Sequence, residues 1–413
     1  MFKGIKIKNW RQFNNIDIEF HPNLTVITGA NGAGKTTILS ILSKHFGWNI
    51  QYASTPSKAR KGIVNYLTGL SLNSEKKTLP KNQNQIQFGE ISYNNFPNNG
   101  LLCVPSAVQQ QFNVHIEGQQ AVQGIYISSH RPVYFYQQVL TIPAKLDAKT
   151  QILNKYLQEL KQRYNLNTKN TSASFRIKEA IISLATFGYG NVVVARDEEA
   201  IEMFEGFQNA LRTILPKSLG FQKIAIHMPE VVFETTTGSF SFDSVSGGIA
   251  SLIDVTWQIF MASMVYDKFV IVMDEPENHL HPKLQRSLLP SLVKAFPEVQ
   301  FIISTHNPFM VTSVPDSNVF MLSYNELNSV DSTELDLINR SGSSNEILRD
   351  VLGVETTLPI WAEEKLEVAV NKIKGQEVNA SSLKQLKNDL NEVGLSDYFP
   401  EALDRVIGGA NSD

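Results

Sequence analysis

The first fifty residues alternate hydrophobic and polar side chains as half-buried strands do. Leu24–Thr28 is a β-branched run typical of a buried strand, a glycine-rich stretch follows it, and Thr36–Phe46 then carries apolar residues at helical spacing. The alternation ahead of that run falls on Ile5, Ile7, Ile16, Ile18 and Phe20. The pattern predicts strand, turn, strand, loop and helix.

The periodicity changes twice further along the chain. After a polar excursion over residues 51–84, short strands are expected between 85 and 128. A 3.6-residue period over 145–215 predicts three helices separated by polar loops. From Asp267 to Met321 the pattern is strand, helix, strand, short helix, strand, which is typical of a parallel sheet.

These patterns predict an α/β fold with a mixed or parallel sheet core, an antiparallel β subdomain, an inserted helical lobe and a C-terminal helical tail. We expect residues 1–144 and 221–325 to form two parts of one head, split in sequence by the lobe at 145–220. Residues 326–413 are expected to form the helical tail, an interaction module.

Composition narrows the function classes. The 413 residues include 37 Lys+Arg and 40 Asp+Glu, so any nucleic-acid contact requires a local basic patch. A single cysteine, Cys103, excludes an intrachain disulfide and a multi-cysteine zinc site. The apolar run Val255–Tyr266 is too short to span a membrane and predicts a core helix. With no secretory signal in view, we expect a soluble, cytoplasmic protein without membrane contact.

The glycine-rich stretch after the buried strand fits the pattern G-x-x-x-x-G-K-[ST]. Its members are Gly29, Ala30, Asn31, Gly32, Ala33, Gly34, Lys35 and Thr36, with Thr37 next to them. Glycines at this strand-to-helix junction let backbone N–H groups point at phosphate oxygens, and the helix N-terminus adds positive potential. Lys35 would reach the β- and γ-phosphates of ATP and Thr36 would ligate Mg²⁺. The competing interpretation is a glycine-rich turn with an incidental lysine.

An apolar strand, Phe269–Met273, ends in two carboxylates. Asp274 can hold Mg²⁺ and Glu275 can orient or deprotonate an attacking water. The carboxyl ends of parallel strands meet at one edge of a sheet, where this pair would join the glycine loop. Without the glycine loop, a surface turn would be the better interpretation of an Asp-Glu pair.

Five ordered motifs resemble ABC-type ATPases. After the glycine loop come Ser246-Gly247-Gly248, then Asp274–Glu277 followed by His279–Pro282, and then Ser304–Asn307. The opening Asn9–Phe13 is similar to the start of the RecF, SMC and OLD branch. The resemblance covers roughly residues 1–48 and 240–325, and implies the ABC-type P-loop ATPase head.

The resemblance implies roles for six positions. Arg11 is similar to the arginine near the nucleotide's phosphates, and Ser246, Gly247 and Gly248 to the signature loop that contacts ATP held by a second subunit. Glu275 looks like the catalytic base and His306 like the switch histidine. The alternatives are a solvated arginine, an ordinary turn for Ser-Gly-Gly, and a helix cap for His306. His279 and His281 could form a metal pair, but packing or interface roles fit the pattern better.

Two departures from the family pattern affect the expected rate of ATP turnover. Ile249 stands where the signature loop usually carries Gln. The family's Mg²⁺-binding Gln has two candidate places, Gln109–Gln111 and Gln137–Gln138. ATP hydrolysis is therefore expected to be slow. Separately, Arg131 at a strand end could lie near the nucleotide or a partner subunit, or it could form a structural ion pair.

The resemblance also implies partners. The segment from Thr36 to Ser246 lacks the heptads of a long SMC-type arm, and the aspartates after Met321 lack the spacing of an OLD-type nuclease. Stand-alone heads of this kind resemble ATPase subunits of bacterial anti-phage operons (Septu, PARIS, retron-associated), which implies a homodimer or higher oligomer around ATP and a separate nuclease or toxin effector. A RecF-like DNA-repair ATPase and an ATP-dependent scaffold are the alternatives.

DNA contact would need one of two basic stretches, and a solvated face is the alternative for both. They comprise Lys161, Arg163, Lys169, Arg176 and Lys178, and Lys58, Arg60, Lys61, Lys76, Lys77 and Lys81.

Overall fold

The computed structural model describes residues 1–58, 64–69, 85–106, 110–166, 172–336, 347–348, 358–373 and 379–408. The chain divides into two compact units, Met1–Ile347 and Leu348–Asp413. Each unit is described by itself.

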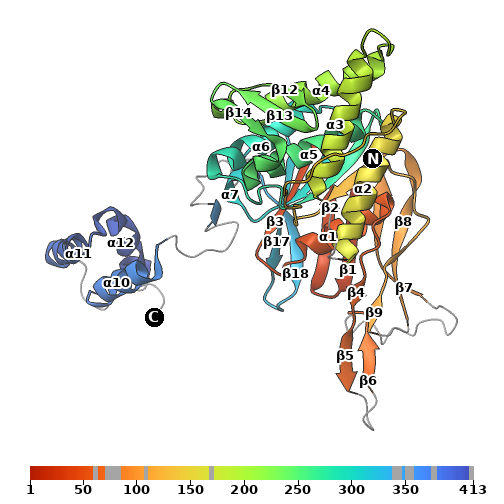
Figure 1. The fold of residues 1–413 in the computed structure, drawn as a ribbon. Helices are drawn as coiled ribbons and strands as arrows, with labels where there is room; N and C mark the ends of the chain where they lie inside the picture. Colours follow the sequence, from red (N-terminus) through yellow and green to blue (C-terminus); the bar gives the residue numbers. More distant parts are fainter. Residues whose placement is uncertain are drawn as a thin grey trace. The chain divides into compact units, whose positions relative to one another are not determined.

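One mixed sheet runs through the first unit (Figure 1). Its strands among the described residues are, in order across the sheet, β10 (His115–Glu117), β8 (Phe96–Pro105), β7 (Gln85–Tyr93), β1 (Phe2–Trp10), β2 (Phe13–Glu19), β18 (Val330–Glu334), β17 (Asn318–Tyr324), β3 (Leu24–Gly29), β16 (Val299–Ser304), β15 (Phe269–Asp274) and β11 (Gly124–Ile127). The strands from β17 to β11 are parallel, whereas β2, β1, β7, β8 and β10 pair antiparallel. Strands β3, β15 and β16 are buried along their whole length, as expected for near-continuous apolar runs.

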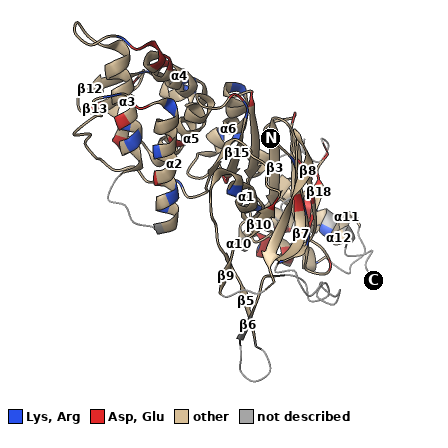
Figure 2. Ribbon diagram, turned by 90° about the vertical axis from the view of Figure 1, so that its right-hand side faces the viewer, with Lys and Arg blue, Asp and Glu red and all other residues tan. Residues whose placement is uncertain are grey.

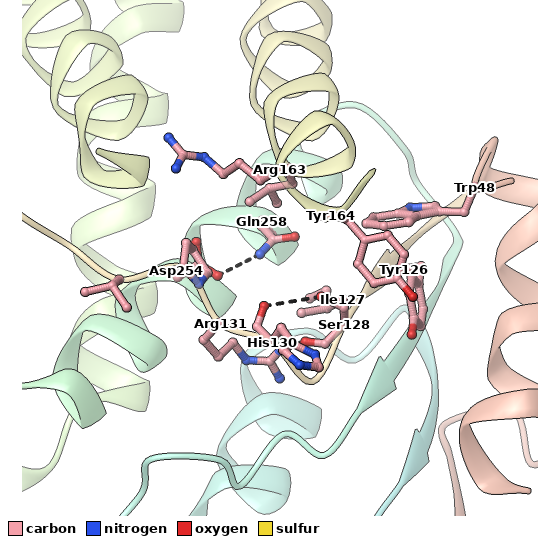
Figure 3. A pocket seen from close by; sticks show the side chains of 13 residues that line it. Trp48, Tyr126, Ile127, Ser128, His130, Arg131, Arg163, Tyr164, Asp254 and Gln258 are labelled. Atoms are coloured by element: carbon pink, nitrogen blue, oxygen red, sulfur yellow. Dashed lines mark hydrogen bonds between the residues drawn. The ribbon is translucent and has the colours of Figure 1, made fainter. Parts of the chain in front are cut away.

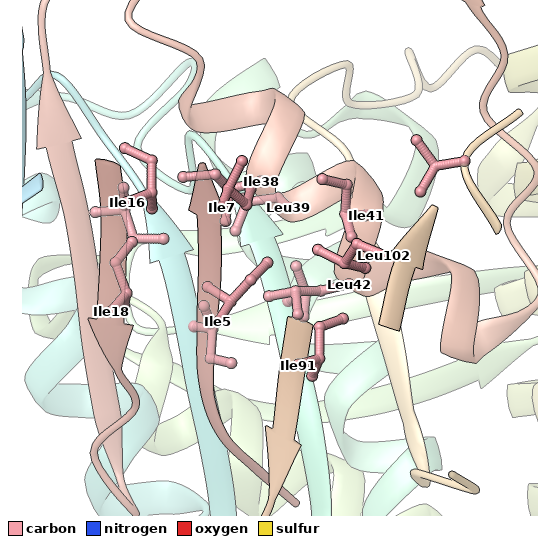
Figure 4. Close-up of a cluster of buried hydrophobic side chains, with 14 of the residues drawn as sticks. Ile5, Ile7, Ile16, Ile18, Ile38, Leu39, Ile41, Leu42, Ile91 and Leu102 are labelled. Carbon is pink, nitrogen blue, oxygen red and sulfur yellow. The ribbon is translucent and has the colours of Figure 1, made fainter. Parts of the chain in front are cut away.

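The helix after β3 builds the main core. In α1 (Lys35–Ser43), Ile38, Leu39, Ile41 and Leu42 are buried. They join the apolar side chains of β1, β2, β7 and β8 in one cluster, as Figure 4 shows. This packing fixes the N-terminus of α1 beside the end of β3, and η1 (Lys44–Phe46) completes the segment. The position of the glycine loop thus follows from the burial of the apolar face of α1 in this cluster.

A helical lobe packs on the other helices. Its members are α2 (Lys149–Leu166), α3 (Ala173–Tyr189) and α4 (Glu198–Ile214), with η2 (Lys217–Leu219) after them. α3 packs on α4, and α4 packs on α5 (Gly247–Ser263) and α6 (Pro282–Ala295). A separate antiparallel sheet of β12 (Phe221–His227), β13 (Glu230–Thr235) and β14 (Gly238–Ser241) contacts α3 and α4. Figure 1 shows this sheet beside the lobe.

Helix α5 is the core helix expected from the apolar run. Every residue from Ala250 to Ala262 is buried, because α5 lies between the lobe and strands β11 and β15. No helix among the described residues combines the length and the apolar character needed to cross a bilayer. Shorter elements complete the first unit: β4 (Tyr52–Ala53), β5 (Thr55–Lys58), β6 (Val64–Leu67), β9 (Gln111–Phe112), η3 (Phe242–Ser244) and α7 (Pro308–Val311).

The second unit is a small helical module. It contains α10 (Ile360–Asn371), α11 (Ala380–Glu392), η5 (Ser396–Tyr398) and α12 (Phe399–Gly408). Its own core includes Leu366, Leu386, Leu390 and Ala402. An asparagine, Asn379, caps α11 by accepting hydrogen bonds from the N–H groups of Ser381 and Ser382.

The element types match the sequence patterns, and three boundaries differ from the expected segments. Strand β11, expected within the β subdomain, pairs parallel to β15 in the central sheet. Residues 221–241 pack with the lobe, although the lobe was expected to end at 220. The first unit continues past 325, because Val330–Glu334 pairs with β17 and β2. These differences arise from long-range strand pairing, which periodicity does not report.

Candidate functional site

The glycine loop connects β3 to α1 in a conformation that requires glycine. Gly29, Gly32 and Gly34 have positive φ angles of 137°, 83° and 100°. A Cβ on Gly29 would lie 2.3 Å from the carbonyl oxygen of Leu322, and one on Gly34 would lie 2.4 Å from Cζ of Phe13. Two of the three glycines are therefore set by close packing as well as by backbone angle. Ala33 is buried, and Ala30 and Asn31 are exposed at the loop surface.

Lys35 folds back over the loop. Its Nζ donates hydrogen bonds to the carbonyl oxygens of Gly29 (2.8 Å) and Ala30 (3.1 Å). Burial lowers the pKa of Lys35, while Glu275 and Asp274 act to raise it. No side chain caps the N-terminus of α1, so its first N–H groups remain available to an anion. Thr37 lies in that first turn and is half-buried.

Two hydroxyls hold the carboxylate of Asp274. Thr36 donates from Oγ1 to Asp274 Oδ2 at 2.9 Å, and Ser304 donates to Oδ1. Asp274 and Ser304 are register partners on β15 and β16, and α1 supplies Thr36. Burial raises the pKa of Asp274, and the two hydroxyl bonds partly offset this. The two expected metal ligands, Thr36 and Asp274, thus lie in direct contact.

The side chain of Glu275 is held between β16 and β11. Its φ angle is 44°, and its N–H donates to the carbonyl of Ser304 at 3.0 Å. Oε1 lies 3.1 Å from Nδ1 of His306, and Oε2 accepts from Nδ2 of Asn278 at 3.1 Å. Asn278 also donates to the carbonyl of Ser129, just after β11. Three strand ends therefore fix this carboxylate.

His306 itself is half exposed, and it is not a helix cap. Asn307 caps α7 instead, by accepting a hydrogen bond from the N–H of Phe309 at 2.9 Å. The neighbouring Glu277 is buried, and it accepts a hydrogen bond from the hydroxyl of Thr305. Burial raises the pKa of Glu277.

Arg131 lies behind the carboxylates. It donates from NH1 to the carbonyl of Ser128, and NH2 lies 3.5 Å from the carbonyl oxygen of Asp274. Burial lowers the pKa of this guanidinium, and the nearby Asp254 and Asp274 act to raise it. Its contacts are with backbone carbonyls, so it braces the end of β11 against the end of β15.

The opening motif forms the turn between β1 and β2, beside the glycine loop. Gln12 donates from Nε2 to the carbonyl of Gly32 at 3.5 Å, and the ring of Phe13 packs on Gly34. Arg11 is exposed, with a positive φ of 54°. Its guanidinium donates to the carbonyl of Ala53 at 3.2 Å and lies near the rings of Trp10 and Tyr52. A role at the phosphates stays a prediction for Arg11.

The signature residues lie at the start of α5. Ser246 and Gly247 are exposed, and within the described residues no hydrogen bond joins Ser246, Gly247 or Gly248 to the glycine loop of the same chain. A Cβ on Gly248 would lie 2.8 Å from the carbonyl oxygen of His279, whereas one on Gly247 would meet nothing within 4 Å. Gly248 is thus packed inside the chain, and the Gly247 side of the loop faces outward.

The other histidine candidates do not form a metal site. His281 caps α6 by accepting from the N–H of Lys283 at 3.3 Å, and His279 is exposed with a φ of 69°. Over the part of the chain that the structure describes, no group of three or more His, Cys, Asp or Glu side chains is arranged to hold a metal ion. Packing or interface roles for His279 and His281 stay a prediction.

The place of the Mg²⁺-binding Gln stays open. Gln137 belongs to the lobe side, because its Oε1 accepts from the N–H of Ser172 at 2.6 Å. Gln111 pairs with Ala53 in the ribbon of β4 and β9, next to Arg11. Gln109 lies outside the described residues.

The basic stretch of the lobe is largely engaged within the chain. Lys161 donates to the carbonyl of Phe46, Lys178 pairs with Asp243, and Arg163 and Arg176 share Glu159. Figure 2 shows basic and acidic positions interspersed along these helices. Lys169 and most of the second basic stretch lie outside the described residues.

The sequence analysis assigned no role to three residues of this site: Ser304, Asn278 and Ser129. The register of β15 and β16 places Ser304 opposite Asp274, so a strand ending in Ser next to one ending in Asp was an available signal. Asn278 and Ser129 meet only through the pairing of β11 with β15, which no local pattern reveals.

Two family models match large parts of the chain. The AAA domain family matches residues 4–214, and the AAA domain family described as a putative AbiEii toxin of a type IV toxin–antitoxin system matches residues 119–312. The Septu protein PtuA of Bacillus thuringiensis is 23% identical over 382 residues, which is 88% of this chain and 87% of that protein. PtuA of Bacillus mycoides is 24% identical over 333 residues, which is 78% of this chain but only 40% of the longer relative.

Two further likenesses are weaker, one because it is short and the other because its sequence identity and TM-score are low. A probable ATPase of retron Vc95 from Vibrio cholerae is 40% identical over 58 residues, which is 14% of this chain and 11% of that protein. An SMC head solved with the C-terminal winged-helix domain of ScpA aligns over 82% of this chain and 98% of that one, at 14% identity and a TM-score of 0.45. The matched family covers half of the sequence and includes the glycine loop. The chain therefore belongs to the AAA domain family, and its relatives support the resemblance to ABC-type ATPases of the RecF, SMC and OLD branch.

Proposed function

We propose that this protein binds ATP with Mg²⁺ at the glycine loop, hydrolyses it slowly, and assembles with further copies whose signature loops close the ATP site. The proposal rests on the positions of the two parts of the expected ATP site within one chain. Lys35, Thr36, Asp274, Glu275 and His306 converge at one edge of the sheet, while the signature loop of the same chain is exposed. A second copy supplies the missing side of the site.

Residues of this chain fit Mg²⁺. The oxygens of Thr36 and Asp274 are 2.9 Å apart, and hydroxyl and carboxylate oxygens are the ligands that Mg²⁺ prefers. The raised pKa of buried Asp274 reports a carboxylate that a nearby cation would stabilise. The ion would supply charge neutralisation at the β- and γ-phosphates. Lys35 would leave the carbonyls of Gly29 and Ala30 to bind the same phosphates.

Glu275 is the proposed base. His306 and Asn278 hold its two oxygens, so the carboxylate has a fixed direction in which to accept a proton from water. His306 is the proposed sensor of the γ-phosphate, since it lies half exposed beside Glu275. Slow turnover is expected because the chain carries Ile249 in the signature loop, and because one copy alone lacks the outer side of the site.

The biological role we propose is control of a separate nuclease or toxin effector in anti-phage defence. Support comes from the likeness to the Septu protein PtuA along most of the chain, and from a second compact unit available for partner contact. Direct action on DNA, as in RecF, is the weaker alternative, because the described basic side chains of the lobe are engaged with acidic residues and carbonyls.

Complementation between two inactive variants tests the shared site. Lys35→Ala should lose ATP binding but keep an intact signature loop, and Gly247→Ala should keep ATP binding but lack a working signature loop. A mixture of the two forms one composite site from two intact halves. We expect phosphate release to reappear in the mixture at up to roughly half the wild-type rate, because at most half of the sites combine an intact glycine loop with an intact signature loop. A mixture as inactive as either variant alone would contradict the shared site.

The effector role needs a separate test. Tagged protein purified from its native host, followed by mass spectrometry, should recover a nuclease or toxin encoded with it. Recovery of DNA with the protein, and an ATPase rate that DNA raises and salt lowers steeply, would favour the RecF-like alternative.

A further inference from the structure

A cavity of about 700 Å³ lies between the lobe and the central sheet. Figure 3 shows it bounded by α2, α5 and the segment after β11. None of its lining residues belongs to the glycine loop or to the Asp274–Glu275 pair. The residues that matter below are Trp48, Tyr126, Tyr164, Arg131, Arg163 and Gln258. The volume is that of a site for a small organic ligand.

One wall of the cavity is aromatic. The ring of Trp48 stands nearly perpendicular to Tyr126 and Tyr164, with centroids 5.0 Å and 5.3 Å apart. Trp48 and Tyr126 are buried and therefore rigid, whereas Tyr164 is 41% exposed. A rigid aromatic wall with one accessible ring offers a surface on which a flat heterocycle can stack.

An unsatisfied acceptor faces the same space. Gln258 is 1% exposed, and its Nε2 donates to Asp254 Oδ2 at 2.9 Å. Its Oε1 is buried and has no hydrogen-bond partner among the residues that the structure describes. The amide orientation is set by the bond to Asp254, whose other oxygen accepts from Tyr156. Buried acceptors in folded proteins are nearly always paired, so this one marks a place for a ligand N–H.

The lining of the cavity also includes Arg131, Arg163 and His130, against the single carboxylate of Asp254. Arg131 also has a buried Nε without a partner among the described residues. Arg163 pairs with Glu159 and is part of the wall through its stem. Guanidinium groups bind phosphate oxygens in a planar fork.

We propose that this cavity binds a nucleoside phosphate, with its base against Tyr164 and Trp48, a base N–H donated to Gln258 and its phosphate beside Arg131. A free nucleotide and the 5′-phosphorylated end of a nucleic-acid strand share this chemistry. Binding here is separate from the ATP site proposed above, and it stands or falls independently.

The cavity touches the ATP site through backbone contacts. Arg131 reaches the carbonyl of Asp274, and the carbonyl of Ser129 accepts from Asn278, which holds Glu275. A phosphate drawing Arg131 into the cavity would shift the end of β11 relative to β15. If the ATP site proposed above is correct, these contacts predict that occupancy of the cavity changes the rate of ATP hydrolysis, whereas binding in the cavity does not depend on that site.

The test uses the full-length Lys35→Ala protein, so that the glycine loop does not contribute. Calorimetry is run with the four nucleoside monophosphates and, separately, with a 5′-phosphorylated trinucleotide. We expect one of these probes to bind with a dissociation constant below about 100 μM. Adding Tyr164→Ala should weaken it about tenfold, the size of a lost base-stacking contact.

Two further variants complete the design. Tyr189→Ala is the matched control, because Tyr189 is a lobe tyrosine of similar exposure that does not line the cavity. It should bind like the parent. Gln258→Leu keeps the size of the side chain and should weaken binding at least fivefold, by removing the acceptor. Circular dichroism checks that each variant is folded.

Binding by a monophosphate identifies a free nucleotide as the source of the chemistry, and binding by the trinucleotide alone identifies a strand end. No heat with any probe at millimolar concentration overturns the proposal. So does binding that Tyr164→Ala leaves unchanged, because the surface position of Tyr164 makes that variant the one least exposed to folding defects.

Discussion

The variant Gly247→Ala distinguishes a role of Gly247 at a contact between subunits from a role in the folding of one chain. In the isolated chain, a Cβ at Gly247 meets no atom within 4 Å, and the residue is the first of α5 with no positive φ. Alanine there should leave the free energy of unfolding unchanged or raise it by about 0.5 kcal/mol, because glycine loses more backbone entropy on folding.

In contrast to stability, ATP-dependent assembly and ATP hydrolysis should be impaired by Gly247→Ala. If Gly247 approaches ATP on a second copy, the added methyl group blocks that approach. ATP-dependent assembly should then disappear, and phosphate release should fall about 100-fold, the size of one lost transition-state contact. Affinity for ATP at the glycine loop of each copy should stay within about twofold of wild type.

Gly248→Ala is the contrasting variant. Its Cβ would lie 2.8 Å from the carbonyl oxygen of His279, so the backbone must shift, at a cost of about 1–3 kcal/mol. The assays are thermal denaturation, sedimentation with ATP, and phosphate release. A Gly247→Ala protein that assembles and turns over like wild type would refute the reasoning.

The remaining predictions concern the carboxylates and the lysine. Asp274→Asn should raise the thermal midpoint of the nucleotide-free protein at neutral pH by a few degrees. The reason is that folding raises the pKa of Asp274 above its unfolded value, so the ionised carboxylate lowers the stability of the folded state once the pH exceeds both pKa values. The same variant should lose Mg²⁺-dependent turnover, and an unchanged midpoint would contradict the burial argument. Asn278→Ala should lower kcat about tenfold and leave the dissociation constant of ATP unchanged, because Asn278 orients Glu275 without reaching the loop; a raised dissociation constant instead would refute that role. Lys35→Ala should abolish ATP binding in calorimetry, and wild-type affinity would reject the glycine loop as the site.

Contiguous patterns predicted the parts of the fold that depend on local sequence. The β-branched run ending at Gly29 and the apolar run ending at Asp274 each form a fully buried strand. The glycines of the loop were also predictable from local sequence, because the positive φ angles at Gly29 and Gly34 restrict the residue type there. Strand, loop and helix are specified within about twenty residues.

Long-range pairing was beyond the reach of these patterns. β18 reads Val-Asp-Ser-Thr-Glu, which is too polar to suggest a strand in a central sheet, yet it pairs with β2 and β17. The contact of Ser129 with Asn278 depends in the same way on β11 lying next to β15. The role of Gly247 could not be predicted from contacts within one chain either, because its outward side meets no atom of the same chain within 4 Å.

The most direct measurement is sedimentation velocity of Glu275→Gln with and without Mg²⁺ and ATP. The amide keeps the size of the side chain but cannot take a proton from water, so ATP should bind and persist. The account predicts a monomeric or loosely associated protein without nucleotide, and a stable dimer or larger oligomer with ATP that Gly247→Ala prevents. A Glu275→Gln protein that binds ATP and sediments unchanged would contradict the shared site.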